Sequence, residues 1–396
     1  MSGKTFTLNK SLGERLYQRF QNALTSLKSD TIEQIEPYSR VTVDDLTTFL
    51  ESAFWASLTA EEGRYHTFRI SLGPPSELSA DILFTHPKAY SPNEISDLSA
   101  VLRNNYKSLG VWYSSQQHLE IWGIADFPNW DIGITANAPG QLLFSMLGGN
   151  DSFKVAISGS WWGFVDSSQV PITWAYYAGM PPNPNSSIST NFEILGKALR
   201  RSSVYESVAK FMLEHGHGGT LVIVPEDHES WRDSLTSIKY ESNAFDEVRK
   251  RVDEWDEAIK KAAAARRWLF LDSGDERKRE QSKKSLEFVA QLTAVDGAVV
   301  LGRDLSLYGF GAKIKPVHPE RRPSIVRISR PFEDASFEEI TMSDLGGTRH
   351  QSAAQFVYDQ RDSVAIVCSQ DGRLSALGWD ADSTRVQVIT NLEYAL

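Results

Sequence analysis

The sequence of 396 residues contains a single cysteine, Cys368, so no disulfide can form within the chain. Cys368 ends an apolar run over residues 363–368, which predicts a buried thiol and suits a reducing compartment. No apolar stretch approaches the roughly 20 residues that a membrane-spanning helix requires, and the first residues lack the apolar core of a secretory signal peptide. We therefore expect a cytoplasmic protein that does not contact a membrane.

An excess of positive charge is also missing. Lysine and arginine number 41 against 51 aspartates and glutamates, which gives a formal net charge of −10. Nucleic acids and anionic lipid surfaces attract proteins through clustered positive charge. We therefore expect no nucleic-acid partner, although a local basic site is compatible with this composition.

Proline and small polar residues mark one break in the chain, at residues 181–190, where we expect an exposed linker. Residues 1–180 begin with apolar residues at helical spacing, such as Leu12, Leu16 and Phe20. Aromatic-rich, strand-like pieces follow at 67–70, 82–84, 111–113, 119–122 and 153–157. This first region is predicted to be an α+β domain.

Residues 191–396 alternate helical and strand-like patterns, which predicts an α/β domain. Apolar spacing favours helices over 192–215, 243–265 and 283–294 and around 353–358, with strands at 220–225, 298–301 and 364–367. The run 220–225 is continuously apolar, as in strands that are covered on both faces. The helix before it is expected to end in the glycine-rich run 215–219, where glycine can adopt the left-handed conformation.

Two short motifs gather functional residue types in this second domain. The first, Asp296-Gly297-Ala298, lies where a predicted helix meets a predicted strand. Its carboxylate could bind a divalent cation or orient a hydroxyl, or it could simply cap a turn. The second, Gly346-Gly347-Thr348-Arg349-His350-Gln351, opens a predicted helix. Backbone amides, a hydroxyl and a guanidinium in that arrangement can hold phosphate oxygens.

Together these motifs resemble those of the DisA-type diadenylate cyclase domain, which carries Asp-Gly-Ala and, downstream, Gly-Thr-Arg-His-Arg before a helix. Residues 216–223 look like the glycine and strand that open that domain, and residues 365–375 look like its closing strand and turn. The resemblance covers roughly residues 195–392. It implies a mixed central sheet that is flanked by helices.

The resemblance also implies an activity, the condensation of two ATP molecules into cyclic di-AMP with release of two pyrophosphates, assisted by Mg²⁺ or Mn²⁺. Each domain would bind one ATP and face a second copy, so the implied partner is this chain itself in a homodimer or higher homo-oligomer. The implied catalytic residues are Asp296, Arg349 and His350, and the implied metal ligands are Asp296 and Asp371. The implied nucleotide-binding residues are Gly297, Ala298, Gly347, Thr348, Arg349, His350, Gln351 and Ser369.

Two positions depart from the family pattern. Gln351 stands where the motif has its second arginine, which removes a positive charge that a polyphosphate would meet. The segment Ser369-Gln370-Asp371-Gly372 stands where many members have two consecutive glutamates, so Asp371 is the only carboxylate left there, with its register shifted by at least one residue. Two functions stay open: a diadenylate cyclase regulated by the N-terminal domain, or a catalytically silent protein that binds ATP or a cyclic dinucleotide.

The first domain carries one recognisable run, residues 56–64, with the sequence Ala-Ser-Leu-Thr-Ala-Glu-Glu-Gly-Arg. This run looks like a signature of sensor-like domains that precede some cyclase domains of this type. It could equally be a helix end and a turn. Aromatic residues within 161–177 could line a ligand pocket or a subunit contact, or form an ordinary core.

Two further clusters are predicted to be structural or solvent-exposed rather than functional. His215 and His217 flank one glycine and predict a helix-ending turn rather than a metal pair, because no other ligand follows at a suitable spacing. Arg321, Arg322, Arg327 and Arg330 are expected on a solvated face, with contact to phosphates or a neighbouring subunit as the alternative.

Overall fold

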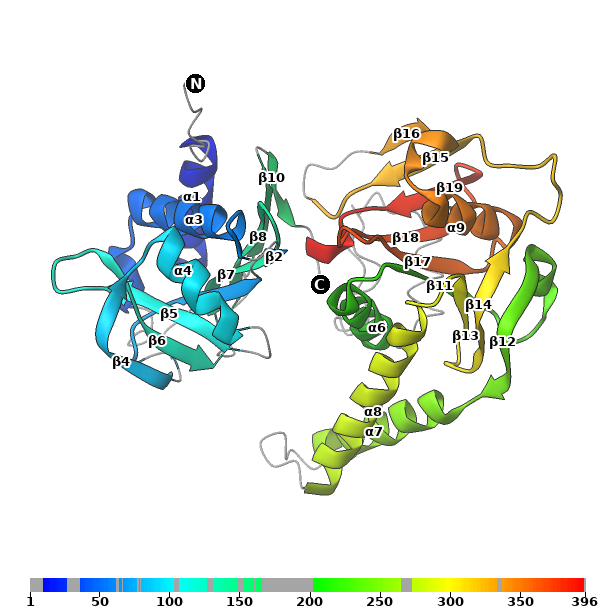
Figure 1. The fold of residues 1–396 in the computed structure, drawn as a ribbon, viewed down its shortest axis with the longest axis horizontal. Helices are drawn as coiled ribbons and strands as arrows, with labels where there is room; N and C mark the ends of the chain where they lie inside the picture. Colours follow the sequence, from blue (N-terminus) through cyan, green and yellow to red (C-terminus); the bar gives the residue numbers. More distant parts are fainter. Residues whose placement is uncertain are drawn as a thin grey trace. The chain divides into compact units, whose positions relative to one another are not determined.

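The structure is a computed structural model, and its described residues form two compact units, Met1–Val165 and Asp166–Leu396 (Figure 1). The described residues are 10–26, 36–61, 64–65, 67–76, 78, 80–102, 107–126, 131–147, 153–159, 161–165, 202–264, 273–332 and 337–394. The linker expected at 181–190 lies outside them. Within this described part, no helix is both long and apolar enough to cross a bilayer.

The first unit combines helices with an eight-stranded sheet, counted over its described residues. The strand order is β10-β9-β8-β7-β3-β5-β6-β4, and β1 and β2 form a separate hairpin. The helices are α1 (Lys10–Ser26), η2 (Glu36–Arg40), α3 (Val43–Ser57), α4 (Pro92–Ser99) and η3 (Ala100–Leu102). The strands are β1 (Ala60–Glu61), β2 (Arg64–Tyr65), β3 (Phe68–Leu72), β4 (Ala80–Ala89), β5 (Lys107–Tyr113), β6 (Leu119–Asp126), β7 (Asp131–Ala138), β8 (Gln141–Leu147), β9 (Phe153–Ser158) and β10 (Trp161–Val165).

The core of this unit forms where α1 and α3 pack with the sheet. Leu12, Leu16 and Phe20 recur every four residues on α1, and all three are buried in one cluster with sheet residues such as Ile134. Helix α3 begins with a capping box, in which Thr42 and Asp45 accept each other's backbone N–H groups. The α+β prediction is confirmed, and each predicted strand piece lies in β3, β4, β5, β6 or β9, whereas β7, β8 and β10 were not foreseen.

The second unit is built on a mixed nine-stranded sheet, counted over residues 202–264, 273–332 and 337–394. The order is β12-β14-β13-β11-β17-β18-β19-β15-β16, with β11/β13 and β15/β19 parallel. Its strands are β11 (Gly219–Val224), β12 (Leu235–Phe245), β13 (Ala298–Gly302), β14 (Leu307–Ile314), β15 (Ile325–Ser329), β16 (Glu338–Thr341), β17 (Val364–Cys368), β18 (Leu374–Asp380) and β19 (Arg385–Ile389). Its helices are α6 (Ser202–His215), η5 (Ser230–Ser234), α7 (Glu247–Ala264), α8 (Ser273–Leu292), η6 (Met342–Leu345), α9 (Thr348–Asp359) and η7 (Leu392–Tyr394).

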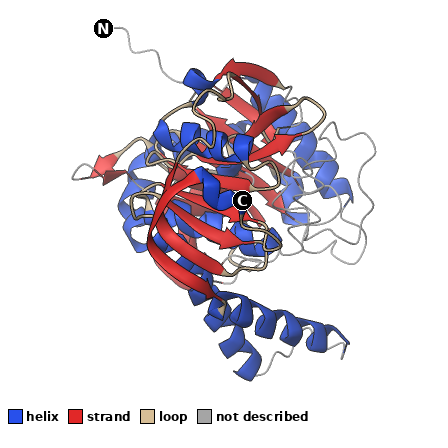
Figure 2. Cartoon of the chain, turned by 90° about the vertical axis from the view of Figure 1, so that its right-hand side faces the viewer, coloured by secondary structure: helices blue, strands red, loops and turns tan. Residues whose placement is uncertain are grey.

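Helices cover both faces of this sheet. Ala365 and Val367 of β17 share a core cluster with Phe356 of α9. Cys368 turns the other way, and its Sγ lies 3.5 Å from the carbonyl oxygen of Met212 on α6. Strand β11 is buried along its whole length, as its apolar sequence predicted. Helices α7 and α8 pack on each other and extend away from the sheet (Figure 2). The predicted α/β class, with a mixed sheet between helices, is confirmed.

Some predicted boundaries were wrong. The helix expected from residue 243 begins at Glu247, because the preceding segment is strand β12, which pairs with β14. Half of β12 is polar and exposed, as at Lys239, so its sequence lacks the apolar run that marked the other strands. Helix α8 starts at Ser273, ten residues before its predicted start at residue 283. The described part of the helix expected over 192–215 is α6, which ends before Gly216 at φ +67°, as predicted.

Candidate functional site

The two sequence motifs meet at the edge of the second sheet that is formed by the ends of its central strands β13, β11 and β17. Strand β11 runs parallel to β13 with Thr220 opposite Ala298, so Gly218 and Asp296 lie just before the starts of neighbouring strands. Strand β17 is antiparallel to β11 with Cys368 opposite Gly219, so the turn after Cys368 reaches the same edge. Strand pairing therefore brings together segments that lie far apart in the sequence.

Arg349 links helix α9 to this edge. A side chain at Gly218 would place its Cβ 3.0 Å from Nη1 of Arg349 and 3.1 Å from the backbone nitrogen of Gln370. Gly218 has a φ of +68° and therefore combines a left-handed backbone with a close approach. The Arg349 guanidinium thus lies between the start of β11 and the turn after β17, where the predicted residue Ser369 is found.

Gly297 sets the close packing beneath Asp296. Its φ is +115°, and a Cβ added to it would lie 2.5 Å from the carbonyl carbon of Gly311 on β14. Only glycine fits this position without moving the neighbouring strand. The next residue, Ala298, is buried and its side chain packs in the core. The Asp-Gly-Ala motif therefore presents one exposed carboxylate above a tightly packed pair of strands.

The Asp296 carboxylate is 91% exposed and pairs with Lys313, whose Nζ lies 2.5 Å from Oδ2. This hydrogen bond and charge lower the pKa of Asp296, and Arg349 and Lys239 lower it further. The carboxylate is therefore ionised at neutral pH. The sequence motifs did not single out Lys313 or Lys239, since a lysine on a polar strand carries no signal of its own.

The second motif forms the start of α9. Gly346 adopts a φ of +121°, and Gly347 is the helix N-cap with no side-chain hydrogen bond to the first turn. A Cβ on Gly347 would meet no atom within 4 Å. Thr348, the first helical residue, is exposed. Backbone N–H groups at such an open helix start can bind an anion.

Gln351 folds back on the same turn. Its Nε2 donates to the carbonyl oxygen of Gly346 at 2.9 Å, and its backbone N–H donates to the carbonyl of Gly347 at 3.2 Å. The side-chain amide therefore stabilises the glycine turn. It brings no charge to the site, unlike the arginine in the family motif.

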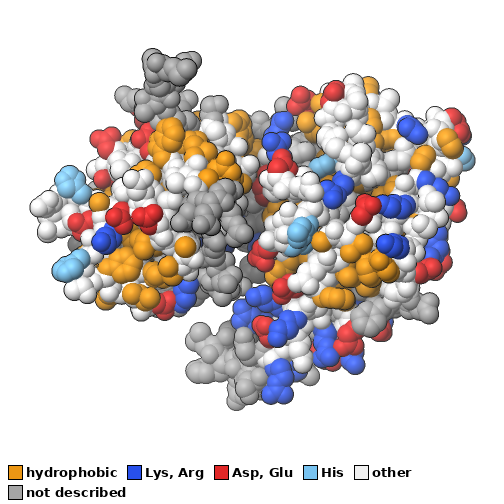
Figure 3. All heavy atoms as spheres, in the orientation of Figure 1, with side chains coloured by type: hydrophobic (Ala, Val, Ile, Leu, Met, Phe, Trp, Pro, Cys, Tyr) orange, Lys and Arg blue, Asp and Glu red, His pale blue; other side chains and the backbone are white. Residues whose placement is uncertain are grey.

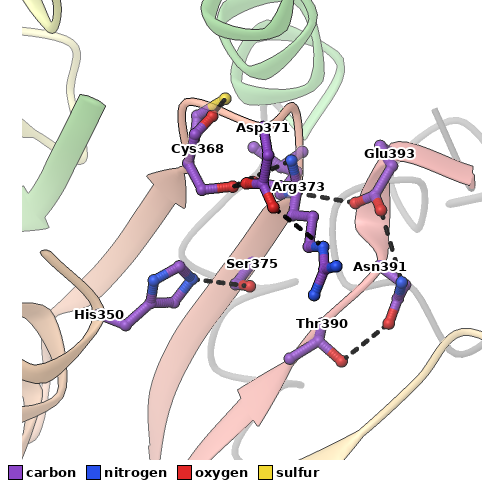
Figure 4. Close-up of polar contacts among 10 residues, drawn as sticks. His350, Cys368, Asp371, Arg373, Ser375, Thr390, Asn391 and Glu393 are labelled. Carbon is purple, nitrogen blue, oxygen red and sulfur yellow. Dashed lines mark hydrogen bonds and ion pairs between the residues drawn. The ribbon is translucent and has the colours of Figure 1, made fainter. Parts of the chain in front are cut away.

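His350 points from α9 toward β18 (Figure 4). Its Nε2 lies 3.2 Å from Oγ of Ser375. Burial lowers the pKa of His350, while the charge of Asp371 acts in the opposite direction. The imidazole is therefore neutral at physiological pH, and its contact with Ser375 fixes the first turn of α9 against the sheet.

Asp371 lies in the turn between β17 and β18. The Ser369 hydroxyl donates to its carboxylate, and Nε of Arg373 lies 3.3 Å from Oδ2 (Figure 4). The Ser369 N–H closes the turn on the Arg373 carbonyl at 2.8 Å. The Asp371 carboxylate is thus held by its own turn.

A buried glutamate lies next to this turn and was not anticipated from the sequence. The Glu393 carboxylate accepts the Leu374 N–H at 2.8 Å, and its side chain is 5% exposed. Burial raises the pKa of Glu393 to about 7, against the opposing effect of the Leu374 hydrogen bond. Figure 4 shows it on the opposite side of the turn from His350.

The carboxylates of this site suit a hard divalent cation bound together with phosphate. Across the described residues, no group of three or more His, Cys, Asp or Glu side chains is placed to enclose a metal ion. Mg²⁺ commonly takes one or two carboxylates and completes its shell with water and substrate phosphates. Asp296 and Asp371 are both exposed, as such a ligand must be.

In the arginine cluster, Arg321 and Arg322 are exposed as expected, whereas Arg327 and Arg330 are partly buried. The Arg327 Nη1 lies 2.9 Å from Asp380 Oδ2, and Arg330 pairs with Glu338. Nδ1 of His215 accepts the backbone N–H of His217 at 3.1 Å, which confirms the helix-ending turn. Lys, Arg, Asp and Glu side chains are interspersed over the face of the second unit shown in Figure 3.

In the first unit, the aromatic residues that were predicted to line a pocket or to form a core differ in their exposure. Trp162 packs against the core and beneath the guanidinium of Arg15, with 4.9 Å between the guanidinium carbon and the ring centroid. Trp161 is 40% exposed on β10. The remaining aromatics of this segment, from residue 166 onward, lie outside the described residues.

Comparison with known families gives a match in the first unit. Residues 40–126 match the family described as "Probable sensor domain DACNV". Over these residues the first unit is similar to this probable sensor domain. The match extends from η2 to β6 and includes the 56–64 run, and this domain is tied to diadenylate cyclase-type proteins. Helix α3 ends within the same run, at Ser57, as the alternative interpretation of that run expected. No curated protein matches the chain.

Proposed function

We propose that the second unit is a diadenylate cyclase domain that condenses two ATP molecules into cyclic di-AMP, under the control of the DACNV domain. The observation that carries this proposal is the convergence of Asp296, Arg349 and the Ser369 turn at one sheet edge. Strand pairing alone does not require a carboxylate, a guanidinium and an open helix start to meet there. Such a set of groups is suited to binding a nucleoside triphosphate.

Each residue has a distinct part in this proposal. The open start of α9, with Gly347 and Thr348, and the Arg349 guanidinium bind the phosphates. Asp296 orients the ribose 3′-hydroxyl that attacks the α-phosphate of the other ATP. One P–O bond forms between the α-phosphorus and the 3′-oxygen, and the bond from that phosphorus to the oxygen bridging the β-phosphate breaks. Pyrophosphate leaves and the hydroxyl proton passes to water. His350 positions the helix through Ser375.

Asp296 and Asp371 are the residues that would hold Mg²⁺ or Mn²⁺. When bound, the metal neutralises phosphate charge as it develops. The protein itself contributes orientation and fixed positive charge, which are the main requirements of phosphoryl-type transfer. Because Asp296 has a lowered pKa, it is available as a carboxylate throughout the neutral range.

A second copy of the chain is part of the proposed reaction. Each site would hold one ATP, and forming two phosphodiester bonds in a ring requires two ATP molecules facing each other. The rate per protein molecule should therefore rise with protein concentration until dimers saturate. The DACNV match supports a regulatory role for the first unit, since this family is tied to cyclase-type proteins.

Two observations favour the second candidate, a silent nucleotide-binding protein. Gln351 supplies no charge and is turned onto Gly346, and Asp371 is held by Ser369 and Arg373. Both departures from the family pattern fall on groups that would meet phosphate or metal. Such a protein would bind ATP or a cyclic dinucleotide without turnover.

Incubation of the full chain with ATP and Mg²⁺ or Mn²⁺, followed by chromatography of the nucleotides, separates the two candidates. We expect cyclic di-AMP from the wild type, its loss in Asp296→Asn, and unchanged product in Asp233→Asn, which removes an equivalent exposed carboxylate on η5. Nucleotide binding without product at every metal and protein concentration would establish the silent alternative.

A further inference from the structure

Three positive side chains from three different elements lie near Asp296. Lys313 of β14 lies 2.5 Å from Asp296 Oδ2. Lys239 of β12 and the backbone carbonyl of Asp296 both lie within 4 Å of a Cβ built on Gly311, and Arg349 of α9 lies against Gly218, before the neighbouring strand. One carboxylate balances only one of these charges. The surplus positive charge at an exposed sheet edge is suited to a polyanion.

The two lysines lie on the same face of neighbouring strands. Strand β12 pairs with β14 so that Ser237 faces Lys313 and Ile238 faces Ala312, which places Lys239 diagonally across from Lys313. The Cβ of Lys239 lies 3.2 Å from the position of a Cβ on Gly311, so the missing side chain at Gly311 lets Lys239 approach. Packing thus brings Lys239 toward the Lys313–Asp296 pair.

Lys313 can leave Asp296 for another anion at little cost. Its side chain is 53% exposed and that of Asp296 is 91% exposed, so their ion pair is largely solvated. Solvated ion pairs contribute little net free energy. A triphosphate presents several charged oxygens and competes well for the ammonium.

Helix α9, by contrast, supplies less charge than the family motif predicts. Gln351 occupies the position of the second arginine, and its amide is bound to the Gly346 carbonyl. Strands β12 and β14 hold two lysines at the same end of the sheet, where Arg349 also lies against Gly218.

We propose that Lys313, assisted by Lys239, is a phosphate-binding residue of this site and supplies the positive charge that is missing at Gln351. This inference rests on the proposed nucleotide function of the second unit. On binding, the Lys313 ammonium transfers from Asp296 to a phosphate oxygen. Asp296 is thereby released to orient the hydroxyl or to bind the metal.

The test is calorimetric titration of the full chain with two probes, inorganic triphosphate and ATP, each with and without Mg²⁺. Lys313→Gln should weaken binding of both probes about tenfold or more, as expected for loss of a charge-assisted hydrogen bond. Lys313→Arg should retain most of the affinity. Lys250→Gln removes an exposed lysine from α7 and should leave both affinities unchanged.

A double-mutant comparison distinguishes direct contact from an effect through Asp296. If Lys313 only neutralises Asp296, then Lys313→Gln should cost nothing in an Asp296→Asn background. If Lys313 binds phosphate, the same loss persists in that background. In addition, Gln351→Arg should restore binding to Lys313→Gln, because it returns the charge from helix α9.

The outcomes separate this inference from the proposed cyclase function. Triphosphate binding that depends on Lys313, without cyclic di-AMP production, supports the inference and overturns the cyclase function. Cyclic di-AMP production with unchanged binding in Lys313→Gln overturns the inference alone. A wild type that binds neither probe overturns both.

Discussion

Replacing Gly297 with alanine should destabilise the edge of the sheet that carries Asp296. The added Cβ would lie 2.5 Å from the carbonyl carbon and 2.8 Å from the Cα of Gly311, and 2.9 Å from the nitrogen of Ala312. These are backbone atoms of β14 and cannot rotate away. Strand β14 must shift, or Gly297 must change its backbone conformation.

The magnitude follows from two separate costs. A positive φ of +115° at a residue with a side chain costs about 1–2 kcal/mol. Forcing an extra carbon into a packed contact costs about 1–3 kcal/mol more. We therefore expect Gly297→Ala to lower local stability by about 2–5 kcal/mol.

Gly216→Ala is the matched control, because it isolates the backbone cost. Gly216 has a φ of +67°, and its added Cβ would meet no atom within 4 Å. It should lose only about 1–2 kcal/mol. The difference between the two variants measures the steric contact with β14.

Amide hydrogen exchange of β13 and β14, read by mass spectrometry, is the suitable assay, since a chain of two units need not unfold in one transition. Gly297→Ala should accelerate exchange there about thirtyfold or more, at about 1.4 kcal/mol per factor of ten. Equal exchange rates in Gly297→Ala and Gly216→Ala would refute the assigned close approach.

Two further predictions concern buried titratable groups. The pKa of Glu393 is raised from 4.5 to about 7, so the folded protein binds this proton more tightly than the unfolded chain does. The protonated carboxyl group therefore contributes on the order of 3 kcal/mol to stability below pH 4.5, and this contribution is lost as the pH rises to about 7. Glu393→Gln should therefore flatten the pH dependence of unfolding between these values; an unaltered profile would exclude Glu393 as its source. Burial raises the pKa of the Cys368 thiol to about 12, so Ellman's reagent at pH 8 should label it only after unfolding in guanidinium. Rapid labelling of the native protein would show that Cys368 is accessible.

The sequence predicted those parts of the fold that are continuously apolar. Strands β11, β13 and β17 are buried, and their predicted ranges agree with the structure to within a residue at each end. Strand β12 was missed because it is half exposed, and a polar strand is recognised only through the strand beside it. The start of α8 was missed for a related reason: its first ten residues are dominated by charged and polar side chains.

The residues of the candidate site likewise fall into those that the sequence revealed and those that only the fold revealed. Asp296, Arg349 and His350 lie in motifs of unusual composition, so they could be selected before the fold was known. Lys313 and Glu393 could not, because each gains its role from distant partners. Lys313 meets Asp296 through pairing of β13 with β14, and Glu393 is buried against Leu374 by the turn that follows β19.

The most direct test of the central claim is mass-spectrometric identification of the product from ATP and Mg²⁺ or Mn²⁺ over a series of protein concentrations. The account predicts cyclic di-AMP and pyrophosphate in a ratio of one to two, with a rate per molecule that rises with protein concentration and disappears in Asp296→Asn. Unconsumed ATP at every concentration, with nucleotide bound to the protein, would contradict it.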